Sequence, residues 1–193
     1  GAVVVPISSR LSDAEVDYVL SDCTPRFLFV DSSLLRSDAA ANSASGPTTF
    51  VLGDSDSERG LENLIASGSD TPAESLPHDV EDLVLGYTSG TTGNPKGAVG
   101  THAAMIICSG YVTGIEYGLG RDDVLLITSP IAHRVGLSRV INTLCLGLST
   151  VIMHAFDPVA AVDLIERHRV TCISVVPTIA RLLAPEFERR PKA

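Results

Sequence analysis

The sequence contains no tryptophan and only two methionines, and its 193 residues include only two lysines, Lys96 and Lys192. Aspartate and glutamate together number 23 against 14 for lysine plus arginine, which gives a formal net charge of −9. A protein that binds a nucleic-acid backbone over a broad surface needs a basic face, so this balance argues against a nucleic-acid partner. Because lysine is so scarce, the position of Lys96 within a glycine-rich segment suggests a role rather than chance.

Long apolar runs and closely spaced cysteines are also absent. The longest weakly polar stretch, TLCLGLSTVIM, is about half of the roughly 20 residues that a membrane helix needs. With no secretory signal pattern, we expect a cytoplasmic protein without a membrane span. Neither a disulfide framework nor a zinc site is indicated, and we expect buried, reduced thiols. The four cysteines, which lie far apart with no CxxC pair, are Cys23, Cys108, Cys145 and Cys172.

Short apolar segments alternate with amphipathic segments along the chain. The predicted strands cover residues 2–6, 26–30, 48–52, 83–88, 96–101, 123–128, 149–153 and 171–176. The predicted helices cover residues 12–22, 61–67, 102–117, 135–147, 156–168 and 177–187. Residues 32–47 are expected to form a loose helix or loop, and residues 68–82 a polar connector.

This alternation predicts the α/β class, as layered α/β/α lobes with mainly parallel sheets covered on both faces. The expected organisation is a first α/β segment at 1–82, a strand and glycine-rich loop at 83–101, and a second α/β segment at 102–193. In such sheets ligands bind at the C-terminal ends of strands, and the glycine-rich loop falls at such an end. The sequence opens abruptly inside an apolar run, GAVVVPI, and we expect it to be a piece of a larger protein.

The stretch YTSGTTGNPKG, residues 87–97, follows the apolar strand sequence LVLG. Its glycines allow a tight turn that presents backbone N–H groups to an anion. Its threonine and serine hydroxyls can donate further hydrogen bonds, and Lys96 adds a positive charge. The segment is therefore a candidate phosphate loop.

A Walker A loop and an ordinary turn are two simpler interpretations of this stretch. A Walker A loop requires four residues between its first glycine and a Gly-Lys-Ser/Thr ending, but Pro95 and Gly97 here flank Lys96, so the spacing excludes it. A glycine- and threonine-rich segment can also be only a turn, and composition by itself does not decide between a turn and a phosphate site.

The order of residues in YTSGTTGNPKG resembles, at every defining position, the signature loop of the acyl-adenylate-forming superfamily. This superfamily includes acyl-CoA synthetases, the adenylation domains of peptide synthetases and firefly luciferase. Three further segments are similar to the family pattern and extend the resemblance over nearly the whole chain. They are GAVVVPISSRLSDAEVDYVLSD, SPIAHRVGL and VIMHAFDPVAAVDLIERHRVTCISVVPTIARLL. The resemblance implies part of the large N-terminal domain of an AMP-binding acyl-CoA synthetase.

The resemblance implies a reaction in which a carboxylate attacks the α-phosphate of ATP, pyrophosphate leaves, and the acyl-adenylate then reacts with coenzyme A. Backbone N–H groups, hydroxyls and one ammonium would surround the β- and γ-phosphates. The implied ATP phosphate-binding residues are Thr88, Ser89, Gly90, Thr91, Thr92, Gly93 and Lys96. Thr91 and Thr92 are also candidate contacts for Mg²⁺.

His133 lies in the stretch that resembles the family's Pro-x-x-His-x-x-Gly motif. The resemblance implies that it lines the path of the acyl carboxylate towards ATP, whereas a lone histidine is otherwise as well explained as a hydrogen-bonded structural residue. Arg134 and Arg139 depart from the family, which usually has small or apolar residues here. They predict either a salt bridge or a polar or dicarboxylic acyl substrate. Ala155 stands where CoA ligases often carry a Lys or Arg, which removes one expected contact to a CoA phosphate.

The expected function is therefore that of a carboxylate:CoA ligase whose substrates are a small carboxylic acid or a fatty acid, ATP and CoA. No catalytic residue is assigned within this chain, because the family's adenine, ribose and catalytic-lysine motifs have no counterpart in it. We expect the chain alone to be inactive and to self-associate through apolar faces. Two alternatives stay open: an amino-acid or aryl-acid adenylation domain that loads a carrier protein, and a noncatalytic nucleotide-binding module.

Overall fold

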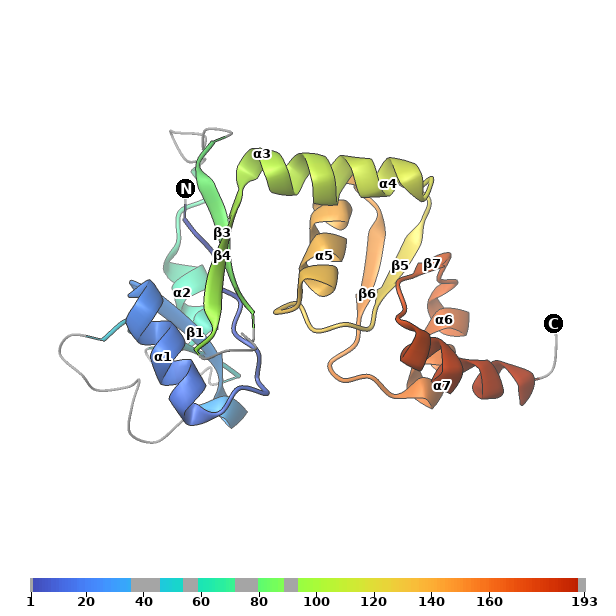
Figure 1. The fold of residues 1–193 in the computed structure, drawn as a ribbon, viewed down its shortest axis with the longest axis horizontal. Helices are drawn as coiled ribbons and strands as arrows, with labels where there is room; N and C mark the ends of the chain where they lie inside the picture. Colours follow the sequence, from blue (N-terminus) through green and yellow to red (C-terminus); the bar gives the residue numbers. More distant parts are fainter. Residues whose placement is uncertain (1, 36–45, 54–58, 72–79, 89–93, 191–193) are drawn as a thin grey trace. The chain divides into compact units, whose positions relative to one another are not determined.

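The computed structural model describes residues 2–35, 46–53, 59–71, 80–88 and 94–190. The described residues fall into two compact units. The smaller is drawn from Ser9–Leu76 and Ser89–Pro95, and the larger from Gly1–Ser8, Pro77–Thr88 and Lys96–Ala193. Each unit has its own sheets and helices (Figure 1).

Strands and helices alternate as the sequence predicts. The described strands are β1 (Phe27–Asp31), β2 (Thr48–Leu52), β3 (Asp82–Thr88), β4 (Lys96–Thr101), β5 (Val124–Ile127), β6 (Ser149–Ile152) and β7 (Cys172–Ile173). The described helices are α1 (Asp13–Cys23), η1 (Ser32–Leu34), α2 (Leu61–Ser67), α3 (His102–Ala104), η2 (Met105–Val112), α4 (Thr113–Glu116), α5 (Arg134–Leu146), α6 (Pro158–His168) and α7 (Pro177–Glu188).

The smaller unit contains the parallel pair β1 and β2. Helix α1 begins with the capping box that its sequence indicates: the Glu15 N–H donates to Ser12 Oγ, and the Ser12 N–H donates to Glu15 Oε2 at 2.8 Å. The Ser12 hydroxyl, which donates to Glu15 Oε2 at 2.7 Å, and the Ser12 N–H together lower the pKa of the Glu15 carboxyl. Val19 of α1 is fully buried. In the predicted segment 32–47, the described part has one 3₁₀ turn, η1.

The larger unit begins with a single β-bridge where the sequence predicts a strand at residues 2–6. Val4 exchanges two hydrogen bonds with β3, to the Leu83 carbonyl and from the Leu85 N–H. The prediction of a strand at residues 2–6 is therefore wrong in length, because only Val4 pairs with β3. Strands β3 and β4 form an antiparallel hairpin, so β4 is the return strand that the sequence predicts.

Strands β5, β6 and β7 form a parallel sheet in the order β6-β5-β7 with helices on both faces. Successive side chains of a strand point to opposite faces. Leu126 packs with Ala161 and Val162 of α6 and Leu183 of α7. Leu125, on the other face, belongs to a second cluster that includes Ile127, Leu148, and Val140 and Leu146 of α5. The predicted α/β/α layering is thus confirmed in this unit.

Strand β7 is shorter than the predicted strand at 171–176. Only Cys172 and Ile173 pair with β5. The next carbonyl, that of Ser174, accepts a hydrogen bond from Thr128 Oγ1 at 3.3 Å instead of continuing the ladder. The chain then turns to begin α7 at Pro177, where a proline is well placed in the first helical turn.

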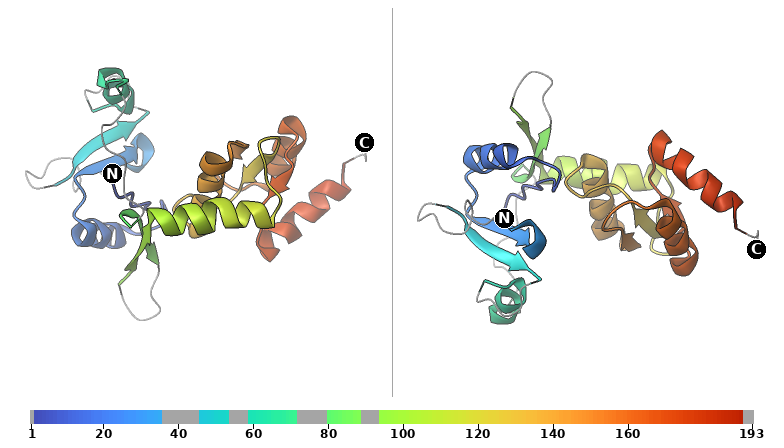
Figure 2. Two further views of the ribbon diagram at one scale, coloured as in Figure 1. Left: turned by 90° about the horizontal axis from the view of Figure 1, so that it is seen from above. Right: turned by 90° about the horizontal axis from the view of Figure 1, so that it is seen from below.

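The predicted helix at 102–117 is present as one continuous helical rod of α3, η2 and α4 (Figure 2). Its middle eight residues, Met105–Val112, have π-helical geometry, which the sequence does not indicate. Asn142 of α5 is fully buried and donates from Nδ2 to the Ser109 carbonyl at 2.6 Å and to the Gly110 carbonyl at 2.7 Å. The rod is thereby fastened to α5 at its π-helical turn.

The four cysteines are free, as predicted. The expectation of buried thiols is wrong for Cys108, which is exposed on η2, and too strong for the other three cysteines, which are half-buried. Burial raises the pKa of the Cys23, Cys145 and Cys172 thiols, which lowers the thiolate fraction and hence their reactivity at neutral pH. None of the helices that the structure describes is long and apolar enough to cross a membrane.

The Asp123 side chain ties the start of β5 to the start of β7. Its carboxylate accepts from Thr171 Oγ1 at 2.7 Å and from the Gly120 N–H at 2.8 Å. These hydrogen bonds lower the pKa of the Asp123 carboxyl below its ordinary value. Because the folded pKa is the lower one, this stabilisation is present above the unfolded pKa of about 4 and is lost as the pH falls through the folded pKa.

We therefore expect Asp123→Asn to be less stable than the parent chain at pH 7, with a gap that closes as the pH is lowered below about 4. Urea unfolding at pH 7, 5 and 3 measures this gap. A gap of equal size at pH 7 and pH 3 would show that the ionised carboxylate contributes nothing.

Candidate phosphate-loop and acyl site

Thr88 and Lys96 lie directly opposite each other at the loop end of the β3–β4 hairpin. Thr88 is the last residue of β3, Lys96 is the first residue of β4, and both are exposed. Side chains of directly paired residues have Cβ atoms about 5 Å apart. The hydroxyl and the ammonium are therefore within reach of one anion. The five intervening candidates, Ser89, Gly90, Thr91, Thr92 and Gly93, lie outside the described residues.

Gly97 leaves room for side chains of β3. A Cβ at this position would lie 2.8 Å from Leu85 Cδ1 and 3.3 Å from Tyr87 Cζ. The side chains of β3 thus lie across the glycine, next to Lys96. A larger residue would require the Leu85 and Tyr87 side chains to move.

The chemistry of this end of the hairpin fits a polyphosphate. Lys96 forms no ion pair with any residue that the structure describes, so its charge is available to a ligand. A compact ammonium and an adjacent hydroxyl are the kinds of donor that phosphate oxygens accept. Among the described residues no group of three or more His, Cys, Asp or Glu side chains could hold a metal ion.

His133 is the N-cap of α5, and the predicted helix therefore starts one residue earlier, at Arg134. The His133 Nδ1 atom accepts a hydrogen bond from the Val135 N–H at 3.3 Å. A neutral imidazole that accepts at Nδ1 carries its proton on Nε2. The exposed ring therefore presents Nε2–H as a donor, and its orientation is set by the helix end.

The loop before α5 explains the spacing of Pro130, His133 and Gly136. The His133 N–H donates to the Pro130 carbonyl at 2.9 Å, which closes the turn. An added Cβ on Gly136 would lie 2.3 Å from that carbonyl oxygen and 2.7 Å from the oxygen of Ser129. The first turn of α5 therefore rests directly on the backbone that follows β5, at the carboxyl end of the sheet. Proline, histidine and glycine each have a separate structural role in placing the imidazole.

The two arginines near His133 have different environments. Arg134, the first residue of α5, is exposed. Arg139 is buried, with its guanidinium carbon 5.7 Å from the centre of the exposed Tyr117 ring at the end of α4. Neither arginine forms an ion pair with a described residue, so the predicted salt bridge is not found in that part of the chain.

The structure brings the predicted residues together in two groups, Thr88 with Lys96 and His133 with Arg134. No hydrogen bond or ion pair between described residues joins the groups. Sequence reasoning missed the buried amide of Asn142, although a polar residue within the apolar helix sequence VINTLCL was a signal for it. It also missed the capping role of His133, which its position before the helix could have shown.

The AMP-binding enzyme family matches this chain over residues 1–193. The chain therefore belongs to the AMP-binding enzymes, as the resemblance of its loop implied. Three curated relatives are similar in sequence. Indoleacetate–CoA ligase of Aromatoleum aromaticum is 32% identical over 182 residues, 92% of this chain. Long-chain-fatty-acid–CoA ligase FadD13 of Mycobacterium tuberculosis is 34% identical over 97% of the chain. Fatty acid–[acyl-carrier-protein] ligase ScoC of Streptomyces coeruleorubidus is 33% identical over 96%.

Solved structures support the same assignment. The inhibitor-bound N-terminal domain of FACL13 from Mycobacterium tuberculosis has a TM-score of 0.80 and 31% identity, and the match covers 98% of this chain and 48% of that one. O-succinylbenzoate CoA synthetase of Bacillus subtilis, in complex with ATP and magnesium, has a TM-score of 0.78 and 26% identity, covering 98% and 37%. The chain spans 35% to 37% of the length of the three curated relatives.

Proposed function

We propose that the full-length protein is an ATP-dependent carboxylate:CoA ligase, an acid-thiol ligase. The observation that carries this proposal is the pairing of an exposed Thr88 with an uncompensated Lys96 at the end of a hairpin, inside the loop that resembles the family signature. Its substrates would be a small carboxylic acid or a fatty acid, ATP and CoA. We expect it to act in the cytoplasm.

The reaction requires two anions to meet. A carboxylate oxygen forms a bond to the α-phosphorus of ATP while the bond to pyrophosphate breaks, so negative charge grows on the departing group. Lys96 would neutralise part of that charge, and Thr88 would donate a hydrogen bond from the opposite strand. Ser89, Gly90, Thr91, Thr92 and Gly93 would complete the cradle, with Thr91 and Thr92 near Mg²⁺. Bound Mg²⁺ would supply further neutralisation of the phosphate oxygens.

His133 is proposed to act at the acyl end of the reaction. Its Nε2–H is free to donate to a carboxylate oxygen, because Nδ1 is already engaged by the Val135 N–H. Arg134, exposed on the next residue, would add positive charge there. A ring fixed as an N-cap is a preorganised donor, since reorienting it sacrifices about 1 kcal/mol of capping stability.

Two substitutions of His133 can distinguish its role as the N-cap of α5 from its proposed role at the acyl site. Asparagine is a good N-cap but lacks an imidazole N–H. In the full-length enzyme we expect His133→Asn to keep the parent stability and to lower pyrophosphate release with the best acid by about tenfold or more. We expect His133→Ala to lower activity equally and to lose about 1 kcal/mol of stability as well. Thermal melts and pyrophosphate release, measured on both variants, test this. Full activity in both variants would remove His133 from the acyl site.

A specific observation supports a second candidate acceptor. ScoC, which is as similar to this chain as the CoA ligases are, is a ligase for an acyl carrier protein. The thiol that receives the acyl group in this protein is thus either CoA or a carrier-protein thiol. The noncatalytic alternative also stays open for the full-length protein.

One experiment distinguishes these functions. The full-length protein is incubated with Mg-ATP and a panel of carboxylic acids, and pyrophosphate release is followed with and without CoA. A CoA ligase releases pyrophosphate repeatedly only with CoA and yields acyl-CoA by mass spectrometry. A carrier-protein ligase exchanges pyrophosphate with the same acids but makes no acyl-CoA. A noncatalytic module does neither, and that result would refute the proposal.

The chain of 193 residues is itself proposed to be inactive and to self-associate. Many large apolar side chains are exposed in it, among them Ile65, Val80, Leu144 and Ile115. Exposed apolar side chains promote association where they gather into a patch.

A further inference from the structure

Arg139 is a buried cation on α5 that has no evident structural task. Only 6% of the residue is exposed, and its Nε and Nη1 atoms have no hydrogen-bond partner among the described residues. A charged group that is removed from water is costly unless it is paired and hydrogen-bonded. The Asn142 amide, buried three residues further along α5, instead donates to two carbonyls of η2. The guanidinium of Arg139 makes no comparable contact with a described residue, so holding α5 in place does not account for its burial.

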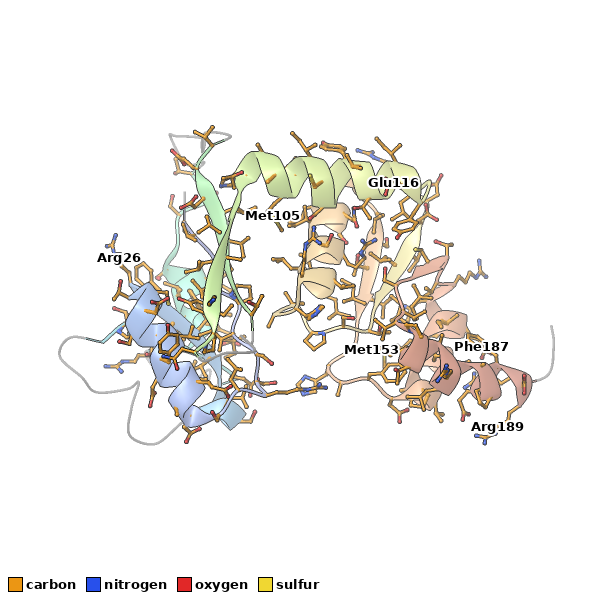
Figure 3. The ribbon with its side chains drawn as sticks, viewed as in Figure 1. Arg26, Met105, Glu116, Met153, Phe187 and Arg189 are labelled. Carbon is orange, nitrogen blue, oxygen red and sulfur yellow. The ribbon has the colours of Figure 1, made fainter. Side chains whose placement is uncertain are left out.

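No described carboxylate neutralises Arg139. Asp123 and Arg139 both act electrostatically on the Cys172 thiol, but the Asp123 carboxylate is held by two hydrogen bonds of its own. Glu116, the last residue of α4, is exposed (Figure 3) and forms no ion pair with a described residue. Six further acidic residues of this chain lie outside the described ranges, namely Asp38, Asp54, Asp56, Glu58, Glu74 and Asp79. The anion that meets Arg139 is therefore a carboxylate of the protein outside the described residues or a carboxylate of a ligand.

The position of Arg139 favours a ligand. His133, which is proposed to hold the acyl carboxylate, caps α5, and Arg139 follows six residues later on the same helix, about 9 Å further along its axis. His133 stands at the end of the helix and not on its side, so a chain that starts there can follow the face that carries Arg139. The charge of Arg139 acts on Cys172 of β7, which packs in the Leu125 cluster between the sheet and α5. An acyl group that extends from His133 along α5 can thus reach this cation.

Tyr117 is a weak cover for the guanidinium. Its ring centre lies 5.7 Å from the guanidinium carbon of Arg139, and the residue is 64% exposed, so little packing holds the ring in place. A cation–π contact of an exposed ring is weak beside a charge-assisted, bidentate pair between arginine and carboxylate. A ligand carboxylate can therefore take the place of the ring and form two strong hydrogen bonds.

We propose that Arg139 binds the second carboxylate of an α,ω-dicarboxylic acid, and that the full-length protein activates such acids in preference to monocarboxylic acids of the same length. The inference rests on the proposed ligase function, because that function places the first carboxylate at His133. A guanidinium matches a carboxylate in a planar, bidentate pair. An apolar acyl tail leaves the buried charge unpaired, and a site built to hydrogen-bond a substrate group strongly rejects the analogue that lacks it.

The test compares acids that differ only in the second carboxylate. Succinate, adipate, suberate and sebacate are paired with butyrate, hexanoate, octanoate and decanoate, and kcat/KM for pyrophosphate release by the full-length protein is measured with Mg-ATP and CoA. We expect the value for suberate to exceed that for octanoate by at least about tenfold. Succinate should have no advantage over butyrate, because its two carboxylates are too close together to reach from His133 to Arg139.

Substitution of Arg139 should reverse this preference. Arg139→Leu should lower kcat/KM for suberate by roughly 10²-fold and raise it for octanoate, because an apolar tail then meets an apolar side chain. Without ligand the variant should be at least as stable as the parent, since it loses an unpaired buried charge. The matched control Arg167→Leu makes the same change at an exposed position of α6, on the other face of the sheet, and should alter neither quantity.

A carboxylate of the protein as the partner of Arg139 gives a different result and would overturn the proposal. Arg139→Leu would then lose stability and lower kcat/KM for both acids alike, because breaking a buried ion pair leaves its partner unpaired. Each of the six acidic residues outside the described ranges is also replaced by its amide, in the parent and in Arg139→Leu. A replacement that lowers stability only in the parent identifies the ion-pair partner.

Calorimetric titration with suberate and with octanoate separates this inference from the ligase function. Binding of suberate that is lost in Arg139→Leu, without pyrophosphate release, would refute the ligase function and leave the role of Arg139 supported. Pyrophosphate release with no preference for suberate over octanoate would refute the role of Arg139 alone. Neither pyrophosphate release nor binding of suberate would refute both.

Discussion

Lys96→Ala is expected to lower pyrophosphate-forming turnover of the full-length enzyme by roughly 10²-fold, the effect of removing one preorganised donor from a charge-stabilising site. The stability of the protein should hardly change, because Lys96 is exposed and forms no ion pair with a described residue. Steady-state pyrophosphate release and thermal melts measure the two quantities.

The chain offers a matched control for this experiment. Its only other lysine is Lys192, and Lys192→Ala removes the same charge from the sequence. We expect that variant to retain the parent turnover. If a folded Lys96→Ala variant has the same turnover as the parent enzyme, the end of the hairpin does not bind the phosphates.

Among the glycines that the structure describes, we expect Gly136 to lose the most stability when it is replaced by alanine. The added methyl group would lie 2.3 Å from the Pro130 carbonyl oxygen, so either α5 or the loop after β5 must move. Because both contacting atoms belong to the backbone, relief by a side-chain rotation is not available. We expect a loss of about 3 kcal/mol, at the upper end for overpacking. Activity of the full-length enzyme should fall as well, since the same turn holds His133.

Gly120→Ala is the control for that substitution. Nothing lies within 4 Å of a Cβ at Gly120, and its backbone does not have a positive φ. Replacement by alanine there should change stability by less than about 0.5 kcal/mol. Urea unfolding of both variants gives the comparison, and a Gly136→Ala protein as stable as Gly120→Ala would show that the turn adjusts freely.

Most of the fold could be predicted from the sequence because its local signals are consistent. The capping box at Ser12, the Asp157 N-cap and Pro158 of α6, and the short apolar run of β5 all produce the structures that they predict. The Asp157 side chain accepts from the Ala160 N–H at 2.7 Å, as an N-cap should. Each of these patterns acts between residues close in sequence. The structure that each one predicts therefore forms without the help of residues far away in the chain.

Other features could not be predicted because they depend on residues far apart in the sequence. How many residues pair at Val4 and in β7 depends on the partner strand, which is distant in the sequence. Two carbonyls of the π-helical turn accept hydrogen bonds from Asn142, which is 32 or 33 residues away in the sequence. Burial of Arg139 runs against the usual exposure of arginine. At the site, the sequence named His133 through the family pattern, but only the structure shows that Nδ1 is engaged by the helix end.

The π-helical segment also constrains how the chain can change in length. A π-helix accommodates an extra residue relative to an α-helix with the same number of turns. Deleting one residue between Met105 and Val112 while the segment becomes α-helical would therefore leave the residues after it facing in nearly the same direction, with Gly114 still towards Leu146. The same deletion in an α-helical part of the rod would rotate everything after it by about 100° about the helix axis. In comparisons of homologues or in engineered variants, the π-helical segment is thus the place where this rod can lose one residue and keep its contact with α5.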